Sequence, residues 1–158
     1  MISRDTKRSV ALLSTVAMLT MLSATGALHA EKDGVALAGY DTVAYFTMNK
    51  AVKGKSEFKA AYLGKTWHFA NAEHKELFEK NPDKYAPQYG GYCAWGIAAK
   101  DDFFPSDPTV FAIHGGKLYL NYNKGVSSDW NKNRAGFIKQ GDANYARSKK
   151  PVATEVND

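Results

Sequence analysis

Cysteine is almost absent from this sequence, because Cys93 is the single one among 158 residues. A lone cysteine excludes an intramolecular disulfide. It also excludes the usual structural zinc sites, which need four ligands and combine several thiolates at fixed spacing. In an oxidising compartment we therefore expect this thiol to be buried, bound to something or paired with another molecule.

A strong excess of charge of one sign is also missing. The formal net charge is only +5, and three of the basic residues, Arg4, Lys7 and Arg8, lie close to the N-terminus. Lys149 and Lys150 form the one later basic cluster. This pattern lacks the basic patch of a nucleic-acid-binding protein, so we expect no nucleic-acid partner.

The only long apolar run is Val10–Leu22, directly after the basic N-terminal residues. This order, followed by a small residue at Ala30, is typical of a secretory signal peptide. The run is too short and too rich in hydroxyl groups for a convincing membrane span, although a retained anchor is the alternative. We therefore expect a signal peptide over residues 1–30, a periplasmic or secreted protein, and no stable membrane span after cleavage.

Two hairpins are predicted in the remaining chain. Residues 57–62 and 65–70 flank Leu63-Gly64, and residues 109–113 and 117–122 flank His114-Gly115-Gly116. Each pair of apolar, alternating segments is separated by glycine where a tight turn needs positive φ. Residues 43–46 also alternate and predict a short strand.

Helices are predicted over Ala72–Lys80 and from about Ser127 to Lys139. Asn71 is a good N-cap for the first, and the residue before Pro82 ends it. Together these elements predict an α+β fold, a small single domain of β-hairpins packed with two or more helices over residues 31–147. Residues 148–158 are expected to form a disordered tail.

The residues with metal-binding side chains are His68, His74, Cys93 and Asp41. His74 shares the apolar face of its predicted helix, and Cys93 follows Gly90-Gly91. Thiolate and imidazole together suit copper or zinc, and the soft thiolate favours Cu(I).

Each of these residues also has a purely structural interpretation. His68 fits a solvated strand position, and His74 fits a core histidine bonded to a carbonyl group. Cys93 fits an inert buried residue. Asp41 most simply caps a turn, or orients a histidine. His114 at the hairpin tip is expected to serve the turn.

Several stretches resemble the YHS domain, a short module found beside copper-transporting ATPases and in some phenol hydroxylases. They are Tyr62–Tyr85 (YLGKTWHFANAEHKELFEKNPDKY), Gly39–Phe46 (GYDTVAYF), Pro87–Ala94 (PQYGGYCA) and Gly116–Asn121 (GKLYLN). The region from Gly39 to about Tyr145 is similar to an exported, stand-alone bacterial YHS-domain protein. The resemblance implies a YHS-like core with GYDTVAYF as its entry strand.

The resemblance also implies metal binding. Its general pattern has two cysteines four residues apart, at positions occupied here by Ala70 and His74. We therefore expect a site of His74 and Cys93 with His68 or Asp41, holding copper as Cu(I), with zinc as the alternative. The protein would act as a metal carrier or buffer, with a metal-handling protein as a candidate partner.

Two other functions remain open. One is a metal-free module that binds a small ligand or a protein in an aromatic pocket, for which Tyr40, Tyr45, Tyr89, Tyr92 and Trp95 supply side chains. The other is an enzyme that uses Cys93 as nucleophile or redox centre, which needs a depressed thiol pKa and a neighbouring base. The resemblance transfers no catalytic residue, so we rank the enzyme last.

Overall fold

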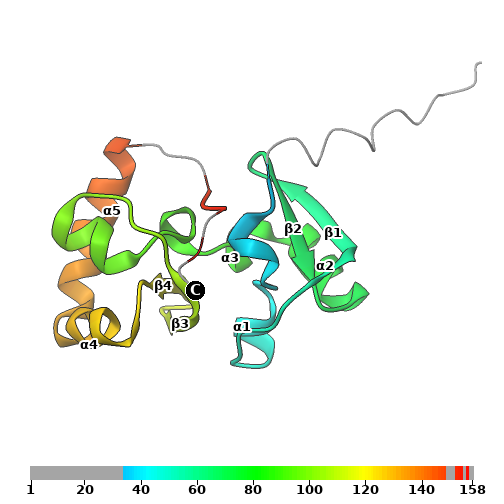
Figure 1. Ribbon diagram of the computed structural model, residues 1–158, viewed down its shortest axis with the longest axis horizontal. Coiled ribbons are helices and arrows are strands. Elements are labelled where there is room, and N and C mark those ends of the chain that lie inside the picture. Colours follow the sequence, from blue (N-terminus) through cyan, green and yellow to red (C-terminus); the bar gives the residue numbers. More distant parts are fainter. Residues whose placement is uncertain (1–33, 149–151, 155, 157–158) are drawn as a thin grey trace, which may run out of the picture.

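The protein is described by a computed structural model that covers residues 34–148, 152–154 and 156. The residues expected to form the signal peptide lie outside this part of the chain. Figure 1 shows two halves side by side, each with a small two-stranded antiparallel sheet and several helices. This architecture confirms the predicted α+β class. The elements are, in order, η1 Ala36–Gly39, α1 Ala44–Thr47, β1 Lys55–Tyr62, β2 Lys65–Phe69, α2 Ala72–Lys80, α3 Pro82–Tyr85, η2 Gln88–Gly91, η3 Gly96–Lys100, β3 Asp107–His114, β4 Lys117–Asn121, α4 Lys124–Lys132 and α5 Arg134–Ser148.

Both predicted hairpins are confirmed. β1 pairs with β2, and the turn residues Leu63 and Gly64 have φ of 50° and 71°. β3 pairs with β4 around Gly115 and Gly116, with φ of 58° and 72°. Two consecutive residues with positive φ give the turn that matches the twist of paired strands, which explains why glycine stands in both turns.

The first half has its core between the β1–β2 hairpin and α2. Trp67 and Phe69 both point from the inner face of β2 toward Phe78 of α2. Their ring centroids lie 5.3 and 5.0 Å, respectively, from that of Phe78. Asn71 caps α2 as predicted, since its side chain accepts a hydrogen bond from the backbone N–H of His74. The short helix α3, which the sequence did not predict, follows directly with Pro82 in its first turn.

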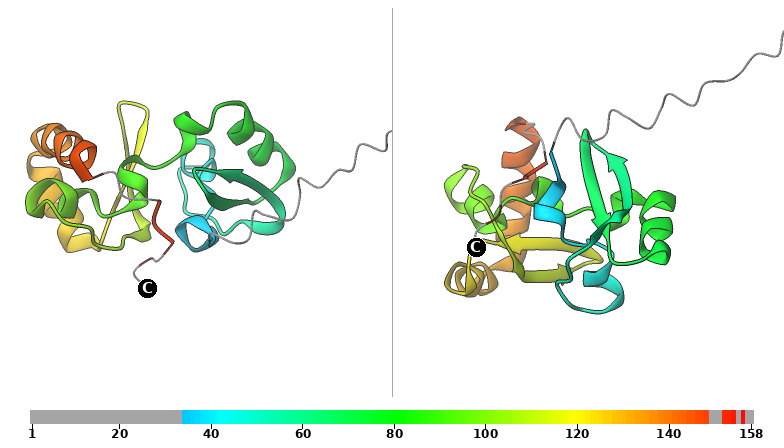
Figure 2. Two further views of the ribbon diagram at one scale, coloured as in Figure 1. Left: turned by 90° about the horizontal axis from the view of Figure 1, so that it is seen from above. Right: turned by 45° about the vertical axis from the view of Figure 1, so that its right-hand side comes forward.

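The central strand of the molecule is β4, which is buried on both faces. Leu118 and Leu120 belong to the core of the first half, whereas Tyr119 packs on Trp130 of α4 in the second half. Successive side chains of a strand point to opposite faces, so one strand supplies both cores. Figure 2 shows the β3–β4 hairpin between the helices of the second half and the first half of the molecule.

The expectation of a strand over residues 43–46 is wrong. Residues Ala44–Thr47 form α1, a single helical turn. The Asp41 side chain accepts hydrogen bonds from the backbone N–H groups of Val43 and Ala44, which satisfies free donors at a helix start. Residues 43–46 are apolar because this helical turn is buried on several sides, and not because they form a pleated strand.

The expected single helix from Ser127 to Lys139 is also wrong in its bounds. It is two helices, α4 and α5, that meet at Asn133. The backbone of Asn133 ends α4, and its side chain accepts a hydrogen bond from the N–H of Gly136, so it begins α5 as well. None of the helices in the described residues is long and apolar enough to cross a membrane.

The expected disordered tail begins too early, because α5 extends to Ser148. Farther along, Val152 and Ala153 are buried. Ala153 exchanges backbone hydrogen bonds with two distant segments, donating to Gly90 and accepting from Leu37. These residues therefore belong to the fold, and residues 149–151, 155 and 157–158 of the expected tail lie outside the described residues.

Candidate functional site

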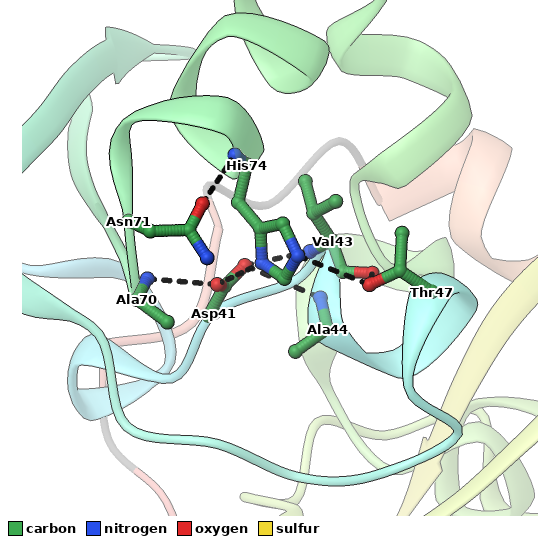
Figure 3. A network of polar contacts seen from close by, with 7 residues as sticks. All are labelled: Asp41, Val43, Ala44, Thr47, Ala70, Asn71 and His74. Atoms are coloured by element: carbon green, nitrogen blue, oxygen red, sulfur yellow. Dashed lines mark hydrogen bonds and ion pairs between the residues drawn. The ribbon is translucent and has the colours of Figure 1, made fainter.

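The Asp41 side chain has four hydrogen-bond partners in the first half of the molecule. It is fully buried, and one oxygen, Oδ1, accepts from the N–H groups of Val43 and Ala44 at 2.9 and 3.3 Å. The other oxygen, Oδ2, lies 2.8 Å from the N–H of Ala70 and 2.6 Å from Nδ1 of His74. Figure 3 shows these groups converging on the carboxylate from three segments of the chain.

The His74 side chain lies between Asp41 and Thr47. Because an ionised carboxylate only accepts, Nδ1 donates to Asp41. On the other side Nε2 lies 3.2 Å from the hydroxyl oxygen of Thr47, whose single proton also has the carbonyl oxygen of Val43 within reach at 3.2 Å. His74 is 6% exposed, so the predicted position on the apolar face of its helix is confirmed. Asp41 both caps a turn and orients a histidine, as its structural interpretation expected.

This pair does not fit a metal ion. Both oxygens of Asp41 and both ring nitrogens of His74 already have hydrogen-bond partners within the protein. A zinc site in a protein uses three or four converging protein ligands. Among residues 34–148, 152–154 and 156, no three side chains of His, Cys, Asp or Glu gather in a way that could hold one.

His68 is separate from this network. It is half-buried on β2, opposite Lys59 of β1, and its Nδ1 faces the backbone of Gly39 closely enough that a β-carbon there would lie 3.2 Å away. Burial lowers the pKa of His68, with a further contribution from the charge of Lys59. The neutral form of His68 is thus favoured. Its neighbours on β1 and at Gly39 account for its position without a metal ligand role.

Cys93 lies beside β4, and not beside His74 on α2. The backbone of Cys93 forms a β-bridge with Leu120. The thiol, 1% exposed, lies 3.7 Å from Oδ1 of Asn121 and accepts from the N–H of Tyr122 at 3.3 Å. Burial raises the pKa of the Cys93 thiol, and backbone N–H groups oppose this shift only in part. The thiol is therefore neutral and weakly nucleophilic.

Beside Cys93 lies an open pocket of about 650 Å³. Its walls are mostly apolar and come from η3, the loop before β3, the end of β4 and α4. The lining residues are Cys93, Trp95, Gly96, Lys100, Asp102, Phe104, Pro105, Tyr122 and Val126. A concave, largely apolar surface of this size with a few polar groups is the usual form of a small-molecule site.

A buried amide lies directly behind this pocket. Asn121 is fully buried, and its Oδ1 accepts from the N–H of Trp95 at 3.1 Å. Its Nδ2 has no hydrogen-bond partner within the described residues. A buried donor without a partner lowers the stability of the fold by about 1–3 kcal/mol. The unpartnered amide of Asn121, next to Cys93 and Trp95, is therefore an unusual feature of this wall.

The sequence identified only part of this pocket. Cys93 and Trp95 were singled out, but Phe104, Tyr122 and Lys100 were not. The other aromatic residues named for a pocket lie elsewhere: Tyr45 is in the first core and Tyr40 packs against it, and Tyr89 and Tyr92 line smaller hollows of about 310 Å³ each. The pocket residues come from four separate elements, so no local spacing could have linked them.

Comparison with known proteins bears on the first half of the molecule. A family model described as the YHS domain matches residues 43–89. The chain contains a YHS domain. No curated protein and no solved structure matches it. The matched YHS segment includes Thr47 and His74 and ends before Cys93, so the large pocket lies on the part of the chain that follows it.

Proposed function

We propose that this YHS-domain protein is a metal-free binding module for a small organic molecule, held in the pocket beside Cys93. The observation that carries this proposal is the pocket itself, about 650 Å³ with aromatic and apolar walls. Pockets of this size accommodate drug-sized ligands, for which the hydrophobic effect supplies most of the affinity. The neutral, hydrogen-bonded state of Cys93 supports binding rather than covalent chemistry.

A substitution that fills the pocket tests this function. Val126 of α4 is a half-buried wall residue, so Val126→Trp adds bulk without removing a core side chain. Ser128→Trp is the matched control, because Ser128 lies on the same helix, is exposed and does not line this pocket. Binding of the fluorescent apolar probe 1-anilinonaphthalene-8-sulfonate should be lost in the first variant and kept in the second. Equal binding by both variants, or none by the native protein, would overturn the proposal.

Copper carriage is the competing function. Its support is the YHS family together with the imidazole of His74 and the thiol of Cys93, which are the ligand types that Cu(I) prefers. Against it stands the engagement of those donors in hydrogen bonds within the protein. Stoichiometric Cu(I) or Zn(II) binding that disappears in both His74→Ala and Cys93→Ser would favour the carrier over the organic-ligand module.

We place this binding outside the cytoplasm. The basis is the signal-like pattern of residues 1–30 in the sequence. Mass spectrometry of the protein isolated from its own cells should give a mature N-terminus close to residue 31, in a periplasmic or secreted fraction. An intact N-terminus in the cytoplasm would contradict the proposal on location and leave the pocket unaffected.

A further inference from the structure

One end of the pocket beside Cys93 carries a cation without an anionic partner. Lys100, the last residue of η3, lines the pocket. None of the ion pairs formed within the described residues includes it. Its ammonium group lies over the ring of Trp95, 5.4 Å from the centroid. The pocket lining thus places an ammonium group beside an aromatic surface.

The two carboxylates next to Lys100 in the chain, Asp101 and Asp102, each have a partner other than Lys100. Asp101 pairs with Arg147 of α5, with Oδ2 2.9 Å from Nη2. Asp102 also lines the pocket, and its Oδ1 accepts from the N–H of Phe103 at 2.7 Å. Lys100 is therefore the one cationic side chain that lines the pocket, and Asp102 is the one carboxylate, with one of its oxygens bound to the backbone.

The walls near Lys100 favour a flat, apolar partner. Phe104 is 38% exposed, one of the few large apolar side chains at the surface of the described residues. Its ring lies directly on Gly96, where an added β-carbon would come within 2.6 Å of it. Trp95 and Tyr122 supply two more rings around the same space. Aromatic rings stack favourably on one another, and an exposed ring gains most from being covered.

The segment that presents Lys100 is held in place from behind. η3 is a π-helical turn, a geometry that is uncommon and is often found at functional sites. Asn144 of α5 is buried, and its Nδ2 donates to the carbonyl oxygens of Ile97 and Ala98 at 2.8 and 3.3 Å. Asp101 then ends the turn with a left-handed conformation, at φ of 53°. The backbone of Lys100 is thereby fixed at the edge of the pocket.

From these contacts we infer that the ligand is an aromatic acid. Its ring system lies among Trp95, Phe104 and Tyr122, and its acidic group pairs with the ammonium of Lys100. This inference rests on the proposed binding function and adds the chemical class of the ligand. The charge of Lys100 disfavours an aromatic cation at this end of the pocket, since two neighbouring cations repel each other.

Two probes of equal size test the inference on the full-length, metal-free protein. Naphthalene-2-carboxylate carries the acid, and naphthalene-2-carboxamide is its neutral counterpart. The native protein should bind the carboxylate about fivefold more tightly, the range expected for a partly exposed ion pair. The preference should shrink as salt is added, because ions screen such a pair.

Substitutions identify the residue responsible. Lys100→Gln should abolish the preference, so that the carboxylate and the carboxamide bind with equal affinity. Lys124→Gln, which alters an exposed lysine outside the pocket, should keep it. Asp102→Asn should keep or increase it, because a negative charge near the acid is removed.

The outcomes separate this inference from the proposed function. Equal affinity for both probes, blocked by Val126→Trp, would overturn the acid preference and keep the pocket as a binding site. An acid preference that survives Lys100→Gln would overturn the role of Lys100. No binding of either probe, together with no 1-anilinonaphthalene-8-sulfonate binding to the native protein, would overturn both.

Discussion

The carboxylate of Asp41 lies 2.6 Å from Nδ1 of His74, although 33 residues separate them in the chain. This contact joins the turn before α1 to the first turn of α2. The same carboxylate accepts the N–H of Ala70 at the end of β2. The aspartate of the GYDTVAYF string thus holds three segments of the first half together around one buried carboxylate.

Replacing Asp41 should strongly destabilise the fold. In Asp41→Ala, three backbone N–H groups and the imidazole of His74 lose their acceptor in a buried place. Removing one partner of a buried, hydrogen-bonded pair costs about 3–5 kcal/mol. Urea unfolding at pH 7 should show a loss of this size.

The control for this measurement is Asp129→Asn. Asp129 is exposed and forms a surface ion pair with Lys132, for which we expect a change below about 1 kcal/mol. A loss below that value in Asp41→Ala would show that the network is not a structural centre.

Gly54 should be irreplaceable for a steric reason that the sequence does not reveal. A β-carbon there would lie 2.4 Å from the carbonyl carbon of His68 and 2.6 Å from the N of Phe69, which are backbone atoms that cannot move aside alone. We expect Gly54→Ala to lower the free energy of unfolding by about 3 kcal/mol or more, by analogy with severe core overpacking.

Gly116→Ala is the matched comparison. Gly116 has φ of 72° and nothing within 4 Å of an added β-carbon, so only left-handed backbone strain of about 1 kcal/mol is expected. Equal losses in the two variants would contradict the close approach at Gly54.

Cys93 should react slowly with iodoacetamide in the folded protein. Its side chain is almost fully buried, and burial raises the pKa of the thiol, so the reactive thiolate is scarce at neutral pH. Alkylation at pH 7.5, followed by mass spectrometry, should be at least about a hundredfold slower than in urea, because the reaction requires local opening. Alkylation as fast as that of a free cysteine would revive the enzymatic alternative.

Alkaline pH should destabilise the protein. Burial raises the pKa values of Tyr45, Tyr89 and the Cys93 thiol above their ordinary values, and a hydrogen bond with Asp142 adds to the shift at Tyr89. Between the unfolded and folded pKa values the folded state holds more protons, so the free energy of unfolding falls as pH rises. The decline should begin near pH 9, where unfolded cysteine and then tyrosine start to ionise at about 8.5 and 10.

Urea unfolding from pH 7 to 11 measures this dependence. Tyr45→Phe removes one titrating group but also its hydrogen bond to the carbonyl of Pro108. The variant should therefore be less stable at pH 7 and show a shallower decline above pH 10. A flat stability profile up to pH 11 in the native protein would contradict the burial of these groups.

Local rules predicted much of the fold. Both hairpins and α2 with its Asn71 cap were predictable, because each depends on residues adjacent in the chain. The strand expected at residues 43–46 failed because the Asp41 side chain supplies hydrogen bonds that alternation does not reveal. The division of the last helix depended similarly on a side chain, that of Asn133.

The candidate site was less accessible to sequence reasoning. Burial of His74 follows from helix periodicity, and the sequence allows Asp41 to orient a histidine. The separation of Cys93 from this pair depends on the placement of β4, which gives the thiol Asn121 and Tyr122 as neighbours. Only the tertiary arrangement of η3, β4 and α4 shows that the space beside Cys93 is a pocket.

The most direct test of the account is native mass spectrometry and elemental analysis of the protein purified under mild conditions from its own cells. We expect the protein to carry no stoichiometric copper or zinc and to retain a small organic acid that Val126→Trp prevents from binding. Copper at one ion per chain, lost in both His74→Ala and Cys93→Ser, would contradict this account and restore the metal carrier.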